Sequence, residues 1–188
     1  MSGPSGFTLI ELMVTVAVAA ILVTVAVPSF QTMIESNGLT SQVNQFITAL
    51  NGARSEAVKR GKQITLCKSA DGNGCGGSTI GYEAGWIVFV DDNQDGVRQT
   101  TEELLRFSGA LKQSYTLRES NNFVTRISFK PSGEANSLGT FVLCKDNNTS
   151  KSRTVIVIRT GRMRSGQDTD KDGIPEGGDG NEITSCAV

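Results

Sequence analysis

The chain has 188 residues, a formal net charge of -1 and no histidine. This length allows one compact domain plus one long helix, and the near-zero net charge indicates no particular class of partner. The lack of histidine excludes Ser-His-Asp and Cys-His catalytic arrangements and every zinc site that needs a histidine ligand, so we expect neither an enzyme nor a cofactor.

The first predicted element is a long apolar helix near the N-terminus. Phe7 to Val27 reads FTLIELMVTVAVAAILVTVAV, and Glu11 is the one charged residue in it. A helix of this length spans about 32 Å, which is enough to cross a bilayer. A secretory signal peptide is the alternative, but the run is long for one and no small-x-small cleavage site follows it. A carboxylate inside such a helix is costly and is usually functional.

The stretch GFTLIELM, which begins at Gly6, resembles the processing signal of type IV prepilins and type II secretion pseudopilins. The resemblance implies that residues 1–6 are a leader, that a prepilin peptidase cuts after Gly6 and methylates Phe7, and that Glu11 assists assembly with other pilins. It also implies that residues 7–28 cross the bacterial inner membrane once, before the protein enters a periplasmic or extracellular fibre. The leader departs from the family pattern because it contains no Lys or Arg.

Helical periodicity continues through residues 29–61. Apolar residues recur there at three- and four-residue spacing and form one amphipathic stripe: Leu39, Val43, Phe46, Ile47, Leu50, Ala53 and Ala57. Lys59 and Arg60 suit the C-terminal end of a helix dipole, and Gly61 suits the position after the last turn. We expect this stripe to pack against a sheet.

The rest of the chain, residues 62–188, predicts a β-rich domain with an acidic C-terminal tail. Short β-type runs are separated by turns rich in glycine, serine and asparagine: Gln63–Lys68, Gly85–Val90, Glu103–Phe107, Tyr115–Arg118, Phe123–Lys130, Thr140–Cys144 and Thr154–Arg159. A long helix followed by short strands predicts the α+β class, with the helix on antiparallel sheet. The resemblance to type IV pilins implies the same fold.

The chain contains four cysteines, Cys67, Cys75, Cys144 and Cys186. In an exported domain an even count indicates two disulfides, for which four cysteines allow three pairings. A zinc site of four thiolates is the alternative, which we disfavour because no Cys-x-x-Cys pair exists. The simplest pairing joins Cys67 to Cys75 around the loop GNGCGG, and Cys144 to Cys186, but spacing alone does not decide it.

The segment DDNQDGVRQTTE matches the spacing of a calcium-binding loop, with Asp91, Asn93, Asp95 and Glu102 at ligand positions. The preceding residues predict a strand, however, and not the helix of a helix–loop–helix site. A polar hairpin turn also needs Asp, Asn and Gly. We therefore interpret the segment as a hairpin turn without a metal, with calcium as the alternative. A shorter fragment of the same kind, DTDKDG, begins at Asp168 and is interpreted as part of the acidic tail.

A basic stretch runs from Lys145 to Arg164, with six basic residues, one acidic residue and a net charge of +5. If its end is extended, Arg162 and Arg164 project to one face about 7 Å apart. Guanidinium groups suit phosphate, and Gly161 would let a phosphate backbone come close. No aromatic residue accompanies them, which favours contact independent of base sequence. Residues 165–188 carry a net charge of -5 and oppose such binding.

Four further stretches resemble the FimT/GspH group of minor pilins and pseudopilins: residues 49–61, 64–67, 85–91 and 160–164. The last contains Gly161, Arg162 and Arg164, which match the Gly-Arg-x-Arg motif that FimT-type minor pilins of naturally transformable bacteria use to bind DNA. The resemblance implies that these residues bind double-stranded DNA during uptake. We expect Arg159 to contribute, and we expect no sequence preference. The alternative is a GspH-like structural pseudopilin of a type II secretion system, and the N-terminal motif does not distinguish the two.

Overall fold

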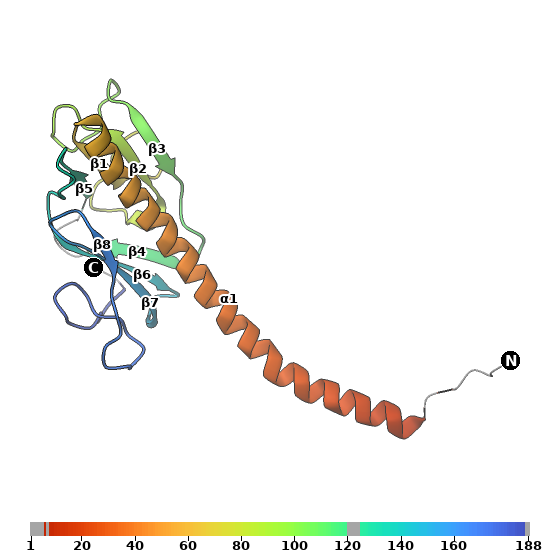
Figure 1. Cartoon of the computed structure of the whole chain (residues 1–188). Helices are drawn as coiled ribbons and strands as arrows, with labels where there is room; N and C mark the ends of the chain where they lie inside the picture. The colour runs from red at the N-terminus through yellow and green to blue at the C-terminus, as the bar shows by residue number, and fades with distance from the viewer. Residues whose placement is uncertain (1–5, 7, 120–124, 187–188) are drawn as a thin grey trace. The chain divides into compact units, whose positions relative to one another are not determined.

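The computed structural model describes residue 6, residues 8–119 and residues 125–186. The chain forms two compact units, Met1–Gly38 and Leu39–Val188. One long helix, α1 (Leu9–Arg60), contributes its N-terminal part to the first unit and its C-terminal part to the second (Figure 1).

In the first unit, α1 is apolar on all sides. It begins with a capped turn, because the amide of Glu11 donates to Oγ1 of Thr8 at 3.3 Å. The exposed side chains of residues 9–27 are almost all apolar. The hydroxyls of Thr15 and Thr24 donate to carbonyl oxygens of the preceding turn, at 2.9 and 2.8 Å, so they need no partner outside the helix. By length and composition, this helix could cross a membrane.

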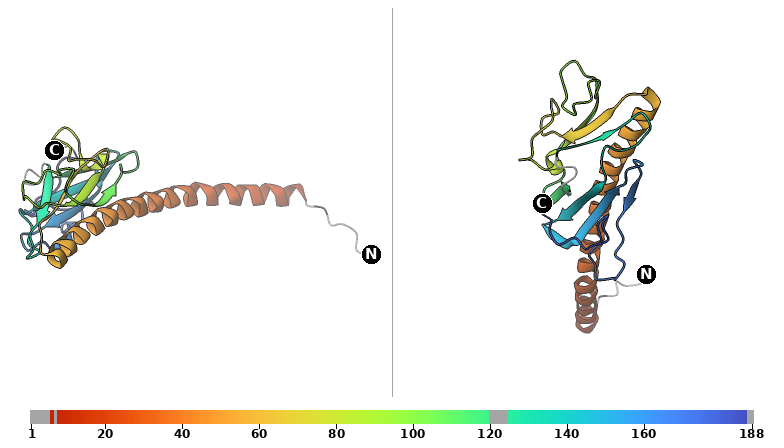
Figure 2. Two further views of the ribbon diagram at one scale, coloured as in Figure 1. Left: turned by 90° about the horizontal axis from the view of Figure 1, so that it is seen from above. Right: turned by 90° about the vertical axis from the view of Figure 1, so that its left-hand side faces the viewer.

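In the second unit, the C-terminal part of α1 packs against the sheets, and Figure 2 shows it lying along one side of the strands. The predicted stripe is buried, with Ile47 half-buried. Phe46 lies at its centre and meets the rings of Tyr82, Trp86 and Phe141 edge to face, with centroids 5.6, 5.1 and 4.8 Å away. The helix ends as expected: Gly61 has a φ of +63°, the left-handed conformation that glycine adopts readily.

The strands form two antiparallel sheets. Sheet A has the order β3-β2-β1-β5 and sheet B the order β4-β6-β7-β8. The strands are β1 (Ile64–Lys68), β2 (Trp86–Val90), β3 (Leu104–Ser108), β4 (Tyr115–Glu119), β5 (Arg126–Phe129), β6 (Gly139–Lys145), β7 (Asn148–Val157) and β8 (Met163–Ser165), and a short 3-10 helix, η1 (Tyr82–Ala84), precedes β2. Asp146 and Asn147 join β6 to β7 with φ values of 54° and 55°, a conformation typical of two-residue hairpin turns.

The core of the second unit lies between α1 and the inner faces of both sheets. A small cluster on the other face of sheet A includes Cys75 of the β1–β2 loop, and one on the other face of sheet B includes Cys186 of the tail. This explains why β1 and β2 are buried along their whole length. All buried apolar side chains of the described residues lie between Leu39 and Cys186, so residues 39–188 contain a complete core.

The predicted α+β class and helix-on-sheet arrangement are correct, and the differences are local. β8 was not predicted, and β7 begins six residues before the predicted Thr154 because the polar segment before it pairs with β6. The predicted fifth strand starts at Phe123, which lies outside the described residues, and β5 begins at Arg126. The expected division between residues 28 and 29 is not a break in secondary structure, since α1 continues through Pro28.

Candidate functional site

The Gly-Arg-x-Arg stretch forms the turn between β7 and β8, at one edge of sheet B. The amide of Gly161 donates to the carbonyl of Ile158 at 2.8 Å, and the amide of Ile158 donates to the carbonyl of Arg162 at 3.1 Å. Gly161 has a φ of +74°, and a β-carbon there would lie 2.0 Å from the carbonyl oxygen of Gly133. Gly161 is buried, so the expectation that a phosphate approaches it directly is wrong. Its role in the structure is to shape the turn.

Three arginines of this hairpin reach solvent. Arg159, Arg162 and Arg164 are exposed, and none of them forms an ion pair with a residue that the structure describes. Met163 packs against the core, so the alternation of a strand places Arg162 and Arg164 on its other face. Arg164 pairs in register with Ile156 of β7. The structure therefore brings the three predicted DNA-binding arginines to one turn and leaves their charges unneutralised by ion pairs there.

A fourth arginine, Arg54 of α1, supports the hairpin. Its Nε donates to the carbonyl of Gly133 at 2.9 Å and its Nη2 to the carbonyl of Thr160 at 3.4 Å. The carbonyl of Arg159 in turn accepts the amide of Ala135 at 3.0 Å. The sequence analysis missed the role of Arg54, because its partners are 79 and 106 residues away and no local pattern connects them.

The acidic tail folds back onto sheet B near the same arginines. The amide of Gly178 donates to the Thr140 hydroxyl of β6 at 2.9 Å. An open cleft of about 520 Å³ is lined by Arg164 together with Glu176 and Asp179. The tail is therefore placed where its negative charge lowers the potential around Arg164.

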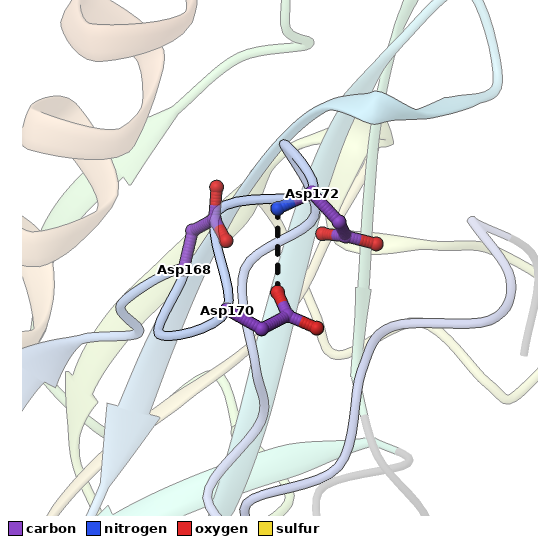
Figure 3. Close-up of side chains that lie close together, drawn as sticks. All are labelled: Asp168, Asp170 and Asp172. Carbon is purple, nitrogen blue, oxygen red and sulfur yellow. Dashed lines mark hydrogen bonds between the residues drawn. The ribbon is translucent and has the colours of Figure 1, made fainter.

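Three exposed aspartates of the tail, Asp168, Asp170 and Asp172, form a cluster that we call the acidic triplet. Their carboxylates lie within 4.8 Å of one another, and the amide of Asp172 donates to Asp170 at 3.3 Å (Figure 3). Asp172 and Asp170 raise the pKa of Glu182, because they place negative charge beside its carboxyl. The triplet offers oxygen ligands to a hard cation, but such clusters are also common as solvated surface.

The other calcium-like segment, DDNQDGVRQTTE, connects β2 to β3, as the hairpin interpretation expected. Asp91 and Glu102 are buried, whereas Asn93 and Asp95 are exposed. The two oxygens of Glu102 accept the amides of Asp92 and Gln99, at 3.0 and 2.9 Å, which closes the loop.

The four cysteines form the pairing that we favoured from the sequence. Cys67 is bonded to Cys75 and Cys144 to Cys186, with Cα atoms 5.5 and 5.9 Å apart, and no cysteine is free. The first bond closes the glycine-rich loop over sheet A, and the second fastens the tail to β6 of sheet B. The alternative zinc site is thereby excluded in this structure.

The predicted processing residues lie at the start of α1. Gly6 is exposed, Phe7 lies outside the described residues, and Glu11 is exposed in the first helical turn. A negative charge in the first turn interacts favourably with the helix dipole. Thr8, which caps the helix, was not singled out from the sequence, although the T-x-x-E spacing is a known start signal.

A buried ion pair joins the two sheets and was also not predicted. Nζ of Lys68 on β1 donates to Oε1 of Glu119 on β4, and both side chains are almost fully buried. The ammonium lies 5.4 Å from the ring centroid of Tyr82. Burial raises the pKa of Glu119, and the hydrogen bond from Lys68 opposes that effect. No periodicity marks either residue as buried.

Two family models match the chain. The model described as "Type II transport protein GspH" matches residues 42–161, and the "Prokaryotic N-terminal methylation motif" matches residues 1–27. The first match extends from α1 to the β7–β8 turn, and the second covers the apolar helix and the residues before it.

Individual proteins are similar as well. Two fimbrial proteins of Pseudomonas aeruginosa are 33% and 32% identical over 115 residues, covering 58% of this chain and 74% of each relative. The crystal structure of the type IV minor pilin FimU from P. aeruginosa has a TM-score of 0.57 and 20% identity, and the match covers 82% of this chain and 98% of that one. At this identity the likeness concerns the fold, which is that of a type IV pilin.

Proposed function

The chain belongs to the GspH family of type IV minor pilins and pseudopilins, and from this premise we propose that it is a minor pilin that binds extracellular double-stranded DNA through the β7–β8 turn. In this proposal it serves DNA uptake in natural transformation and catalyses no reaction. Arg159, Arg162 and Arg164 contact phosphates, and Gly161 holds the turn in shape.

The observation that carries the proposal is the set of three exposed arginines at the β7–β8 turn, to which Arg54 of α1 donates a hydrogen bond. A guanidinium binds phosphate oxygens through two N–H groups at once. The number of phosphates within reach is small, so we expect a Kd of about 10⁻⁴–10⁻⁶ M that weakens steeply with salt. Residues 159–165 include no aromatic side chain on which a base could stack, so we expect no sequence preference.

The acidic tail sets an upper limit on this affinity. The Thr169 hydroxyl lowers the pKa of Glu176, and the Asn181 side chain lowers that of Asp179, so both carboxylates are charged at neutral pH. They line the same cleft as Arg164, where their negative charge opposes the approach of phosphate. Replacing both by their amides, Glu176→Gln and Asp179→Asn, should therefore tighten DNA binding.

The N-terminal unit supports a matching proposal for anchoring and assembly. A prepilin peptidase cuts after Gly6 and methylates Phe7, and the apolar helix then holds the protein in the bacterial inner membrane with a single pass. Glu11 assists entry into the fibre with other pilins. The match to the N-terminal methylation motif supports processing of this kind.

The alternative function is that of a structural pseudopilin in a type II secretion system. It is favoured by the description of the matched family model, which names a type II transport protein. In that case the arginines of the turn are a solvated surface or face a neighbouring subunit. DNA binding distinguishes the two functions.

The test uses the chain truncated before Ser29, which keeps the complete core from Leu39 onward and so retains what folds the second unit. Binding to a short duplex at low salt is measured by gel shift and NMR titration. The double variant Arg162→Gln and Arg164→Gln should lose most of the binding. Two lost phosphate contacts should also reduce the slope of log K against log salt by about 1.8.

The matched control is Arg106→Gln, which removes one exposed arginine from β3 of the other sheet. It should change DNA affinity little, and so should a change at Arg118, which is paired with Glu83. If the control weakens binding as much as the changes in the turn, the interaction is diffuse and the proposed site is wrong. If the parent chain binds no DNA at low salt, the structural pseudopilin is the better assignment.

A further inference from the structure

We propose that the β2–β3 loop, residues 91–102, is a calcium site, independently of any DNA binding. Its ligands are the side-chain oxygens of Asp91, Asn93, Asp95 and Glu102, with the backbone carbonyl of Val97 in the position that the loop pattern gives to a main-chain ligand.

The backbone of the loop is folded as a calcium loop requires. The sixth residue of the pattern, Gly96, has a φ of +73°, and its amide donates to Oδ2 of Asp91, the first residue, at 3.1 Å. The amides of Asp95 and Val97 donate to the side chains two residues before them, Asn93 and Asp95, at 3.2 and 2.7 Å. In each of these bonds a side chain at position one, three or five accepts a backbone amide of the loop.

A buried carboxylate oxygen of Asp91 has no hydrogen-bond donor among the described residues. Asp91 is only 1% exposed, and its Oδ2 accepts hydrogen bonds from Gln63, Thr65 and Gly96. Its Oδ1 accepts none from any described residue. An unpaired carboxylate oxygen in a buried position is costly. A cation bound beside this carboxylate, whose other oxygen accepts the Gly96 amide of the loop, would satisfy Oδ1.

Among the remaining side-chain ligands, one oxygen of Asp95 is held only by movable side chains, whereas the other oxygens accept backbone amides of the loop. Oδ2 of Asp95 accepts the side-chain amides of Asn93 and Gln99, at 2.9 and 2.8 Å, and both can rotate away. Glu102 is buried at the closing position, where its two oxygens accept the backbone amides of Asp92 and Gln99, and a cation bound there would share these oxygens with those amides.

Two positively charged side chains near the loop lower the expected affinity for calcium. A β-carbon on Gly96 would meet the guanidinium of Arg126, so this positive charge lies beside the loop. Arg98 lies within the loop and donates to the carbonyl of Asn73 at 2.5 Å. Because these charges compete with a cation, we expect a Kd of about 10⁻⁴–10⁻³ M, the range of extracellular calcium modules.

Calcium in this loop would stabilise one end of sheet A. The ion would join Asp91, which directly follows β2, to Glu102, which precedes β3. The acidic triplet of the tail carries no such proposal, because it is exposed and has no comparable buried oxygen.

The test is calorimetric titration of the truncated chain with CaCl₂ after removal of divalent ions by a chelator. The expected result is one saturable site whose filling shifts the NMR signal of the Gly96 amide. Asp95→Asn keeps the oxygen that accepts the Val97 amide but removes one charged ligand, and it should weaken binding at least about tenfold. Arg126→Gln removes the competing charge and should tighten binding.

Two matched controls locate the ion. Asp92→Asn removes the same charge from the same loop at a position that is not a ligand, and should weaken binding less than about threefold. Asp170→Asn removes one negative charge from the acidic triplet and should leave calcium affinity unchanged. No saturable binding up to about 20 mM calcium, equal losses for Asp92→Asn and Asp95→Asn, or a loss only for Asp170→Asn would each overturn the proposal.

Discussion

The replacement Gly161→Ala tests how the β7–β8 turn is built. Two costs add at this position. The left-handed backbone, with a φ of +74°, costs alanine about 1–2 kcal/mol. The new β-carbon would also lie 2.0 Å from the carbonyl oxygen of Gly133 and 2.9 Å from Nε of Arg54, so a backbone segment must shift. Crowding of this kind costs about 1–3 kcal/mol, which gives a total of about 2–5 kcal/mol.

The matched control is Gly180→Ala in the acidic tail. Gly180 has a φ of +81°, but a β-carbon there would meet nothing within 4 Å, so only the backbone cost of about 1–2 kcal/mol applies. Urea unfolding of the truncated chain gives the free energy of unfolding for both variants. In a thermal scan, each kcal/mol corresponds to about 2–4 °C in Tm.

The difference between the two variants isolates the contact with Gly133. If Gly161→Ala destabilises the protein no more than Gly180→Ala, the turn does not pack against Gly133 and Arg54 as described. If the larger loss is found, the same variant should also weaken DNA binding, because the arginines on either side of the turn would be displaced.

Three further predictions concern other parts of the chain. Lys68→Met should destabilise the protein by about 3–5 kcal/mol in urea, because it leaves Glu119 charged and unpaired, whereas replacing both residues by apolar ones should cost much less. The pKa of Glu182 is raised above its usual value of 4.5, so its contribution to the free energy of unfolding is fully present below pH 4.5 and is lost as the pH rises through the pKa of the folded state. Unfolding curves measured from below pH 4.5 upward should show this loss for the parent chain, and Glu182→Gln should abolish it. Coexpression with a prepilin peptidase should yield a chain that begins at methylated Phe7 by mass spectrometry, and replacing Gly6 should leave the chain unprocessed; an unprocessed parent chain would contradict the processing proposal.

Local features of the sequence were sufficient to predict the helix that ends before Gly61 and the fold class of the rest. The apolar run after Gly6, the buried stripe around Phe46 and the stop at Gly61 depend on neighbours within one or two helical turns. The pattern of short strands and turns predicted the α+β class for the same reason. The polar beginning of β7, from Asn148, was missed because its partner β6, and not its own apolar alternation, makes it a strand.

Tertiary structure decided how these parts meet. Cysteine spacing allowed three pairings, and the packing of the tail on sheet B selects the one that joins Cys144 to Cys186. The contacts of Arg54 with Gly133 and Thr160, and the return of the acidic tail to Arg164, depend on residues far apart in the chain. Local periodicity reports which face of an element is buried, but not which distant element covers it. That choice is made by the packing of the whole core, and it determines which charges around the candidate site remain unpaired.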